Sequence, residues 1–321
     1  MKAFLMLIRR ELWEHRMLTF VPAFITVLSL LGVLIMFFLP SRLQMGMQMD
    51  GRAQIQMDLR EGHNYSFKTD DFSVKQLVLL YDRLPEDTRG LLINGALHGL
   101  AAGFLPLMLI LIVSYLLDCL YKERKDRSVL FWKSLPISDR DTVLSKLVTG
   151  LIVVPLITLL AIMILQLLVM SLASVVALVC GASIWGSVWG PAEPLRIWLT
   201  GIQLWGVLLL YYMPLATWML LASAWARKSP FLHAVAPVIV LALAEKIILG
   251  SDRFIEWIME WMAGGVAVLA NGSVTRYAHT LSFGVSNLGS FMTQPSIYVG
   301  LLVSVGFLLA TIRVRRWREL G

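Results

Sequence analysis

Charged side chains are scarce in this sequence. Only 15% of its 321 residues are Asp, Glu, Lys or Arg, whereas 58% are hydrophobic, and the mean hydropathy is +0.73. Soluble globular domains carry about 25% charged residues, so the composition excludes an ordinary soluble domain. It indicates an all-α polytopic membrane protein, because helices satisfy the backbone polar groups that lipid cannot.

Cysteines and catalytic motifs are also sparse. The two cysteines, Cys119 and Cys180, lie near opposite ends of different apolar stretches, so we expect no disulfide between them. The sequence contains no Walker A motif, no H-E-x-x-H and no G-x-S-x-G. His98 and Asp118 would stand about 30 Å apart along one helix, too far for a catalytic pair. We therefore expect no enzyme activity in this chain, and no cofactor or metal bound by it.

Long apolar stretches are abundant, and a helix needs about 20 such residues to cross a bilayer. We predict six membrane spans, at residues 18–39, 97–120, 146–180, 200–224, 231–249 and 297–312. The run after Lys146 carries no charge until Glu193 and is long enough for two spans. Charge bias favours one span, with the surplus taken up by tilt, a kink at Pro155 and a loop rich in Gly, Ser and Trp.

Basic residues concentrate at the ends of the predicted spans. Seventeen of the 28 Lys and Arg residues lie in four clusters, at residues 2–16, 121–146, 227–228 and 313–318. The positive-inside rule places these clusters, both termini and the tail 313–321 on the cytoplasmic side of the membrane. We therefore expect a multi-pass protein of the plasma membrane, most simply of a bacterial cytoplasmic membrane. The net charge of +7 then favours anionic lipid of the bilayer as a partner, and not nucleic acid.

The two segments that flank the first span have recognisable patterns. Residues 1–17 place Met1, Leu5, Ile8 and Leu12 on one face and predict an interfacial helix, with a simple charged tail as the alternative. The outer loop 40–96 alternates in polarity over residues 43–59 and predicts a β-hairpin that turns at 50–52. An alternative interpretation of the same residues is a site for a soft metal ion, bound by the thioethers of Met45, Met47 and Met49.

The outer region 250–296 combines an amphipathic helix with a polar stretch. Glu256 and Glu260 share one face of the helix predicted over residues 254–262, which explains them without acid/base chemistry. We expect this helix to stop at Gly264 and Gly265. The polar stretch 271–296 suits an external cap, a re-entrant element or an exposed loop.

The charged segment 121–145 predicts a helix, a turn and a second helix. The second span should continue to about Leu135, where Pro136 ends it, with Glu123 and Arg127 paired at i,i+4 on an exposed surface. Ser138, three residues before Asp141, should cap the next helix. Phe131 and Trp132 are large apolar side chains with no bilayer around them, which favours contact with a protein partner.

This segment resembles the first cytoplasmic loop of ABC-2 type transporter permeases. The resemblance rests on the residues Tyr121, Glu123, Arg124, Arg127, Ser128, Leu130, Trp132, Lys133, Ser134, Leu135, Pro136, Ile137, Ser138 and Lys146. Two departures are Asp126-Arg127-Ser128, where many members have a glycine, and a longer first outer loop. Six spans and an N-terminal interfacial helix agree with the family over the whole chain.

The resemblance implies a permease subunit that dimerises, as a homodimer or heterodimer, and binds two cytoplasmic ABC ATPase subunits. ATP and Mg²⁺ would bind those partners, and Glu123, Arg127, Phe131, Trp132, Pro136 and Ser138 would couple to them. Polar residues within the spans are candidates for a translocation path, with interhelical hydrogen bonding as the alternative: Gln166, Gln203, Tyr211 and Tyr212. The alternative functions are a structural or assembly membrane protein and a membrane-embedded enzyme of another class.

The predicted topology is testable by cysteine labelling. In a chain without Cys119 and Cys180, single cysteines placed at Arg140 and Arg60 should react with a membrane-impermeant maleimide from opposite sides of the membrane. Labelling of both positions from the same side would contradict six spans with both termini in the cytoplasm.

Overall fold

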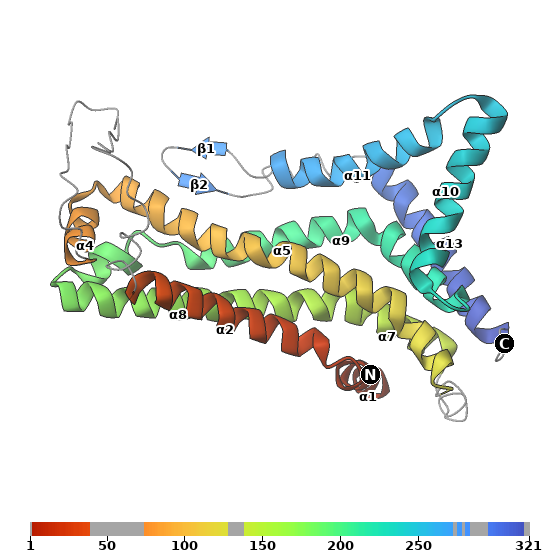
Figure 1. Cartoon of the computed structure of the whole chain (residues 1–321), viewed down its shortest axis with the longest axis horizontal. Coiled ribbons are helices and arrows are strands. Elements are labelled where there is room, and N and C mark those ends of the chain that lie inside the picture. The colour runs from red at the N-terminus through yellow and green to blue at the C-terminus, as the bar shows by residue number, and fades with distance from the viewer. Residues whose placement is uncertain are drawn as a thin grey trace, which may run out of the picture. The chain divides into compact units, whose positions relative to one another are not determined.

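The protein is an all-α polytopic membrane protein, seen here in a computed structural model (Figure 1). The structure describes residues 2–38, 74–127, 138–271, 275–277, 280–282 and 295–317. Nearly all of them are helical, and the exceptions include one antiparallel pair of three-residue strands, β1 (Thr275–Tyr277) and β2 (Thr280–Ser282). The predicted fold class is therefore confirmed.

The described helices occur in the following order along the chain. They are α1 (Lys2–Glu14), α2 (Met17–Phe38), α4 (Val74–Arg83), α5 (Glu86–Lys125), α7 (Asp139–Val148), the π-helical turn η1 (Thr149–Val153), α8 (Val154–Cys180), the π-helical turn η2 (Trp185–Trp189), α9 (Pro194–Trp225), α10 (Pro230–Leu249), α11 (Arg253–Asn271) and α13 (Pro295–Trp317).

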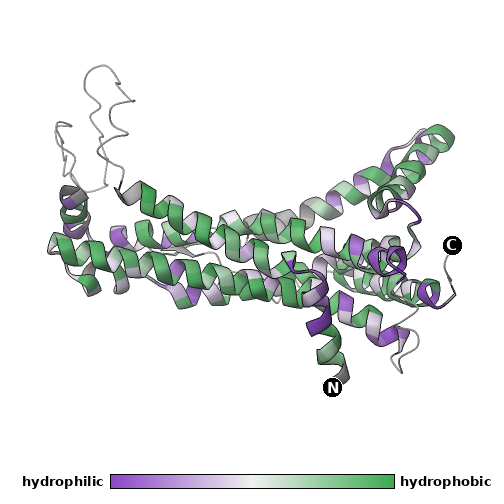
Figure 2. Cartoon of the chain, turned by 60° about the horizontal axis from the view of Figure 1, so that its bottom comes forward, coloured by the Kyte–Doolittle hydropathy of each residue, from purple (hydrophilic) through white to green (hydrophobic). Residues whose placement is uncertain are grey.

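Six helical stretches among the described residues are long and apolar enough to cross a membrane. They are Met17–Ile35, Glu86–Lys125, Asp139–Cys180, Trp185–Trp225, Pro230–Leu249 and Ile297–Trp317. Hydrophobic residues run along most of the length of these helices (Figure 2). The charge-free run after Lys146 stays helical to Cys180, as one span, so the prediction of six spans is confirmed.

The chain forms two compact units. The first comprises residues 1–23, 98–163 and 195–321, and the second comprises residues 24–97 and 164–194. In the first unit, α2, α5, α7, α8 and α9 share an apolar core that includes Leu18, Leu116, Val143, Val154 and Leu220, each at most 3% exposed. This core supports the polar site described below.

In the second unit, polar side chains join the start of α5 to the segment around η2. Arg89 donates to the carbonyl of Gly186 (2.8 Å), and Asn94 donates to the carbonyl of Pro191 (3.1 Å). The side chain of Asn94 also accepts from the backbone N–H of Glu193 (2.9 Å). The Gly-, Ser- and Trp-rich residues predicted to form a loop are thus partly a π-helical turn, held by side chains of α5.

The helix distortion predicted at Pro155 takes the form of the π-helical turn η1, which ends two residues earlier. Pro155 has no backbone N–H to donate to the carbonyl of Leu151, four residues before it. The indole N–H of Trp205 on α9 donates to that carbonyl instead (2.9 Å). The Pro155 distortion is therefore compensated by a bond between two spans of the same unit.

Two predictions about element boundaries were wrong. Helix α5, which contains the predicted span 97–120, ends at Lys125, ten residues before Leu135, and Arg127 has a left-handed backbone with φ of 56°. Helix α11 continues through Gly264 and Gly265 to Asn271. A glycine weakens a helix by only about 1 kcal/mol, a preference that tertiary context overrides. The hairpin predicted over residues 43–59 and its three methionines lie outside the described residues, so that prediction stays a prediction.

Gly150 in η1 tests the packing of the first unit. A Cβ at this position would lie 2.8 Å from Cδ2 of Leu116 and 3.3 Å from Cδ1 of Tyr115, both on α5. Gly150→Ala should therefore lower the free energy of unfolding by about 1–3 kcal/mol, the usual cost of overpacking. Thermal melting in detergent micelles measures the change.

Gly206→Ala is the matched control, because a Cβ on this helical glycine meets nothing within 4 Å. It should leave the melting temperature unchanged or raise it. Equal melting temperatures for the two variants would contradict the described contact between η1 and α5.

Candidate functional site: a buried ion cluster

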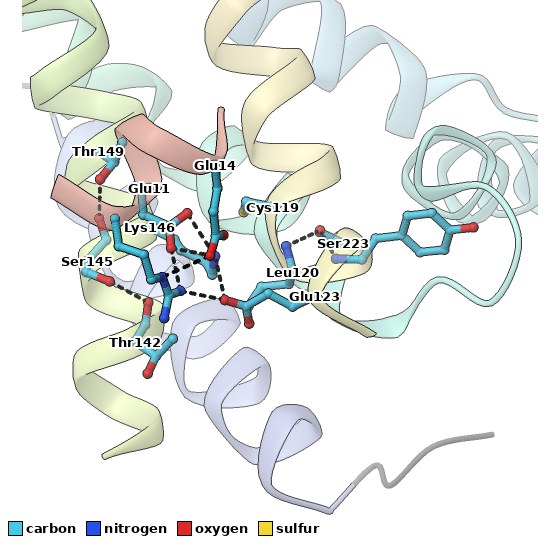
Figure 3. A network of polar contacts seen from close by, with 12 residues as sticks. Glu11, Glu14, Cys119, Leu120, Glu123, Thr142, Ser145, Lys146, Thr149 and Ser223 are labelled. Carbon is cyan, nitrogen blue, oxygen red and sulfur yellow. Dashed lines mark hydrogen bonds and ion pairs between the residues drawn. The ribbon is translucent and has the colours of Figure 1, made fainter. Parts of the chain in front are cut away.

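The most unusual polar feature of the described chain is a set of ionised side chains buried at one end of α5 and α7. Its centre is Lys146 in the last turn of α7, which is 0% exposed. Helix α7 packs against α1 and α13, and it shares the apolar core with α5. Three helices therefore surround the lysine ammonium (Figure 3).

Glu11 of α1 is the first partner of Lys146. The ammonium donates to both carboxylate oxygens, at 2.8 Å and 2.9 Å, and Glu11 is itself 0% exposed. Tyr115 of α5 donates its hydroxyl to the same carboxylate (3.0 Å), and Arg10 donates to it from the side (2.7 Å). The carboxylate thus receives charge-assisted hydrogen bonds on both oxygens.

Glu123 of α5 is the second partner. Its carboxylate lies 3.0 Å from the ammonium of Lys146 and 2.7 Å from the guanidinium of Arg10. Arg315 of α13 donates to the other oxygen of Glu123 (3.0 Å) and also to Asp139 at the start of α7 (3.1 Å). Four helices, α1, α5, α7 and α13, therefore meet at one set of ion pairs.

The buried charges of this ion cluster are of both signs. Its cations are Arg10, Lys146 and Arg315, its carboxylates are Glu11, Glu123 and Asp139, and the more exposed Glu14 pairs with Arg10 at its edge. An unpaired buried ion costs several kcal/mol through desolvation, and near-contact pairing with hydrogen bonds offsets that cost. The six groups are consequently interdependent, since removal of one leaves an opposite charge buried.

Local sequence explains how α7 presents Lys146. Ser138 accepts the backbone N–H of Asp141 at the helix start (3.0 Å), which confirms the predicted cap. The hydroxyls of Thr142, Ser145 and Thr149 bond to carbonyls of their own helix, so these buried polar groups need no partner elsewhere. The buried face of α7 can therefore carry one lysine among small polar and apolar residues.

The pKa shifts around α1 follow from burial and from the neighbouring charges. Burial disfavours the Glu11 carboxylate, but the Lys146 ammonium and the Arg10 guanidinium outweigh it and hold the pKa of Glu11 below its ordinary value. Burial raises the pKa of Glu14, at the edge of the cluster, and lowers the pKa of His15. Glu11 is thus ionised at neutral pH, and the imidazole of His15 is neutral.

The ion pairs of the cluster join four helices, α1, α5, α7 and α13. The oxygens of Glu11 and Glu14 and a ring nitrogen of His15 lie within 4.8 Å of one another, a spacing that suits a metal ion. However, the ammonium of Lys146 already contacts both oxygens of Glu11 and takes the place of a cation. Each of the three cluster carboxylates is likewise paired with at least one cation.

A second polar joint ties the same end of α5 to the end of α9. Arg124 donates to the carbonyls of Ser223 (2.6 Å) and Ala226 (2.9 Å), which are among the last of α9 and its following turn. A cation at this position complements the negative end of the helix. Tyr121 donates its hydroxyl to the carbonyl of Lys228 (2.7 Å), and the Ser223 hydroxyl accepts the N–H groups of Leu120 and Tyr121.

The predicted coupling residues fall in different surroundings. Glu123 is 4% exposed and lies within the ion cluster, whereas Arg127 is exposed beyond the end of α5. The predicted surface pair of Glu123 and Arg127 was therefore wrong, because the buried cations compete for Glu123. Ser138 caps α7, and Phe131, Trp132 and Pro136 lie outside the described residues.

The residues predicted to line a translocation path mostly bond to neighbouring helices. Gln166 is buried and donates to the carbonyl of Leu97 (2.9 Å). Tyr211 and Tyr212 donate their hydroxyls to the carbonyls of Trp261 (2.7 Å) and Met262 (3.0 Å) in α11. Interhelical hydrogen bonding, the alternative interpretation, is thus confirmed for these three residues; Gln203 is exposed on α9.

Sequence reasoning missed most of the ion cluster. The predicted apolar face of the first helix included Leu5, which is 62% exposed, whereas Leu7 and Glu11 face the protein. The available signal was the position of Lys146 at the start of a long charge-free run, which demands a carboxylate partner. The sequence gives no sign of which of the 21 acidic residues supplies it.

Comparison with known proteins adds no relative. No family model matches the chain, and no curated protein and no solved structure matches it. The resemblance of residues 121–146 to ABC-2 permeases therefore stays a prediction.

Lys146→Met tests the cluster directly. It leaves Glu11 and Glu123 with one fewer cation and should lower the free energy of unfolding by about 3–5 kcal/mol, measured by equilibrium unfolding in mixed micelles. Adding Glu11→Gln to this variant should recover part of the loss, because it removes a buried charge left in excess.

Lys246→Met is the matched control. Lys246 also lies 3.0 Å from a carboxylate, that of Asp252, but its side chain is 63% exposed. This exposed pair should contribute only about 0–1 kcal/mol. A loss as large as that of Lys146→Met would show that burial is not the source of the effect.

Proposed function

We propose that this chain is the membrane-spanning permease subunit of an ATP-driven exporter of the ABC-2 type. It would move substrate out of the cytoplasm or out of the inner leaflet. The energy would come from a separate cytoplasmic ATPase subunit, because the sequence contains no Walker A motif. The permease would act as a dimer, with the four basic clusters of the chain on the cytoplasmic side.

The observation that carries this proposal is that the ion cluster contains one residue near each end of the 121–145 segment. Glu123 precedes the segment's turn and Lys146 follows it, and the two side chains lie 3.0 Å apart. The same two residues contact Arg10, Glu11 and Arg315 on α1 and α13. A force applied to the segment would therefore reach four helices through direct ion pairs.

The second joint extends this connection to α9. Arg124 and Tyr121 bond to the α9 end and to the turn before α10, so motion of the last turns of α5 would be passed to that end through these hydrogen bonds. An ATPase that pushed on the segment would thus act on the spans of the first unit together. Such a mechanical link favours a permease over a structural membrane protein, which has no need of one.

Two aromatic side chains of the segment test the proposal. A tagged chain should copurify with a cytoplasmic Walker A protein whose ATP hydrolysis is stimulated in the complex. Phe131→Ala/Trp132→Ala should weaken that association about thirty-fold and abolish the stimulation, because aromatic anchors at interfaces commonly contribute about 2 kcal/mol or more.

Trp317→Ala is the control, since Trp317 is 74% exposed on α13, outside the segment. Its complex should hydrolyse ATP like that of the unaltered chain. Unchanged association and unchanged stimulation in the double alanine variant would defeat the proposed role of the segment. If no ATPase copurified with the unaltered chain, the alternatives of a structural or assembly protein would be favoured.

A further inference from the structure

The outer face of α1 combines exposed apolar side chains with cations. Leu5, Met6 and Trp13 are 62%, 66% and 68% exposed, and Arg9 and Arg16 lie among them at the surface. The guanidinium of Arg9 lies 5.2 Å from the ring centroid of Trp13, a cation–π contact. One exposed surface therefore carries both the apolar bulk and the positive charge of this helix.

The acidic residues of α1 are turned away from this surface or paired. Glu11 is fully buried in the ion cluster, and Glu14 lies 3.4 Å from Arg10. Within the described part of the chain, neither Arg9 nor Arg16 forms an ion pair. We call this surface the α1 outer face; it consists of Leu5, Met6, Arg9, Trp13 and Arg16. Its side chains are either apolar or positively charged.

The position of α1 places this face at a membrane surface. The first span begins at Met17, only three residues after α1 ends at Glu14, so α1 lies where the chain enters the bilayer. Arginine stems can lie along apolar surface while their guanidinium groups reach polar headgroups. Trp is the side chain most suited to the boundary between acyl chains and headgroups.

We propose that the α1 outer face is a binding site for anionic phospholipid, in which Arg9 and Arg16 contact the headgroup phosphates and Leu5, Met6 and Trp13 contact the acyl chains. The charge complementarity favours lipid over an acidic protein, because exposed apolar side chains separate the two arginines as in interfacial helices. The opposite face of α1 carries Glu11, which pairs with Lys146, so the lipid site and the ion cluster lie on opposite faces of one helix.

The test is native mass spectrometry of the full chain in detergent, titrated with phosphatidylglycerol or phosphatidylcholine. The unaltered chain should bind phosphatidylglycerol at least tenfold more tightly. Arg9→Gln/Arg16→Gln should weaken phosphatidylglycerol binding about thirty-fold, because each basic residue near an anionic surface contributes about a five-fold gain in affinity. Binding of phosphatidylcholine should change little.

Two control variants distinguish the effect of the two positive charges on this face from an effect of altered folding and from an effect of the lower net charge of the whole chain. Arg9→Lys/Arg16→Lys keeps both charges and should retain most of the binding. Arg83→Gln/Arg253→Gln removes two exposed arginines from α4 and α11 and should bind phosphatidylglycerol like the unaltered chain. These lipid measurements need no ATPase, so they can fail or succeed independently of the proposed function.

Three results would overturn the proposal. One is equal binding of both lipids by the unaltered chain, and another is unchanged phosphatidylglycerol binding in Arg9→Gln/Arg16→Gln. The third is capture of a polyglutamate peptide by the unaltered chain, but not by Arg9→Gln/Arg16→Gln, at concentrations where phosphatidylglycerol does not bind. That result would assign the face to an acidic protein segment.

Discussion

The buried ammonium of Lys146 is the constraint on which the arrangement of the first unit depends. A lysine with no solvent contact is tolerable only with carboxylates at hydrogen-bond distance, and here Glu11 and Glu123 supply them. Two carboxylates around one ammonium leave a negative excess; Arg10 and Arg315 also pair with Glu123, and Arg315 in turn pairs with Asp139. These partners come from α1, α5 and α13. The burial of one lysine therefore brings the ends of three other helices together.

The last turn of α5 is bonded on two sides. Tyr121 and Arg124, both half-buried at the end of α5, bind backbone carbonyls of the α9 end and of the turn that follows it. Glu123, on the opposite side of the same turn, binds the buried cations. The last turn of α5 is therefore fixed from two sides. Under the proposed function, this turn is the base from which motion of the 121–145 segment passes into the spans.

Polar residues inside the spans illustrate how far a sequence pattern can be interpreted. Gln166, Tyr211 and Tyr212 stand out because amides and hydroxyls are costly in hydrocarbon, and any of them could line a path or join two helices. The structure brings each to a backbone carbonyl, at Leu97, Trp261 and Met262. Residue type predicted that each needed a partner. Only packing decided which partner it found, because the partner carbonyls look like every other carbonyl in the sequence.

The sequence by itself determined the features that depend on local chemistry. Hydropathy gave the six spans, and the spacing of Ser138 and Asp141 gave the cap of α7. The C-terminal end of α5 and the continuity of α11 through Gly264 and Gly265 escaped prediction, because local helix preferences of about 1 kcal/mol are weaker than tertiary packing. Only the tertiary structure decided the ion partners. Lys146 lies 135 residues from Glu11, and Arg315 lies 192 residues from Glu123, so no local pattern relates them. Burial in a shared low-dielectric site makes these distant charges depend on one another.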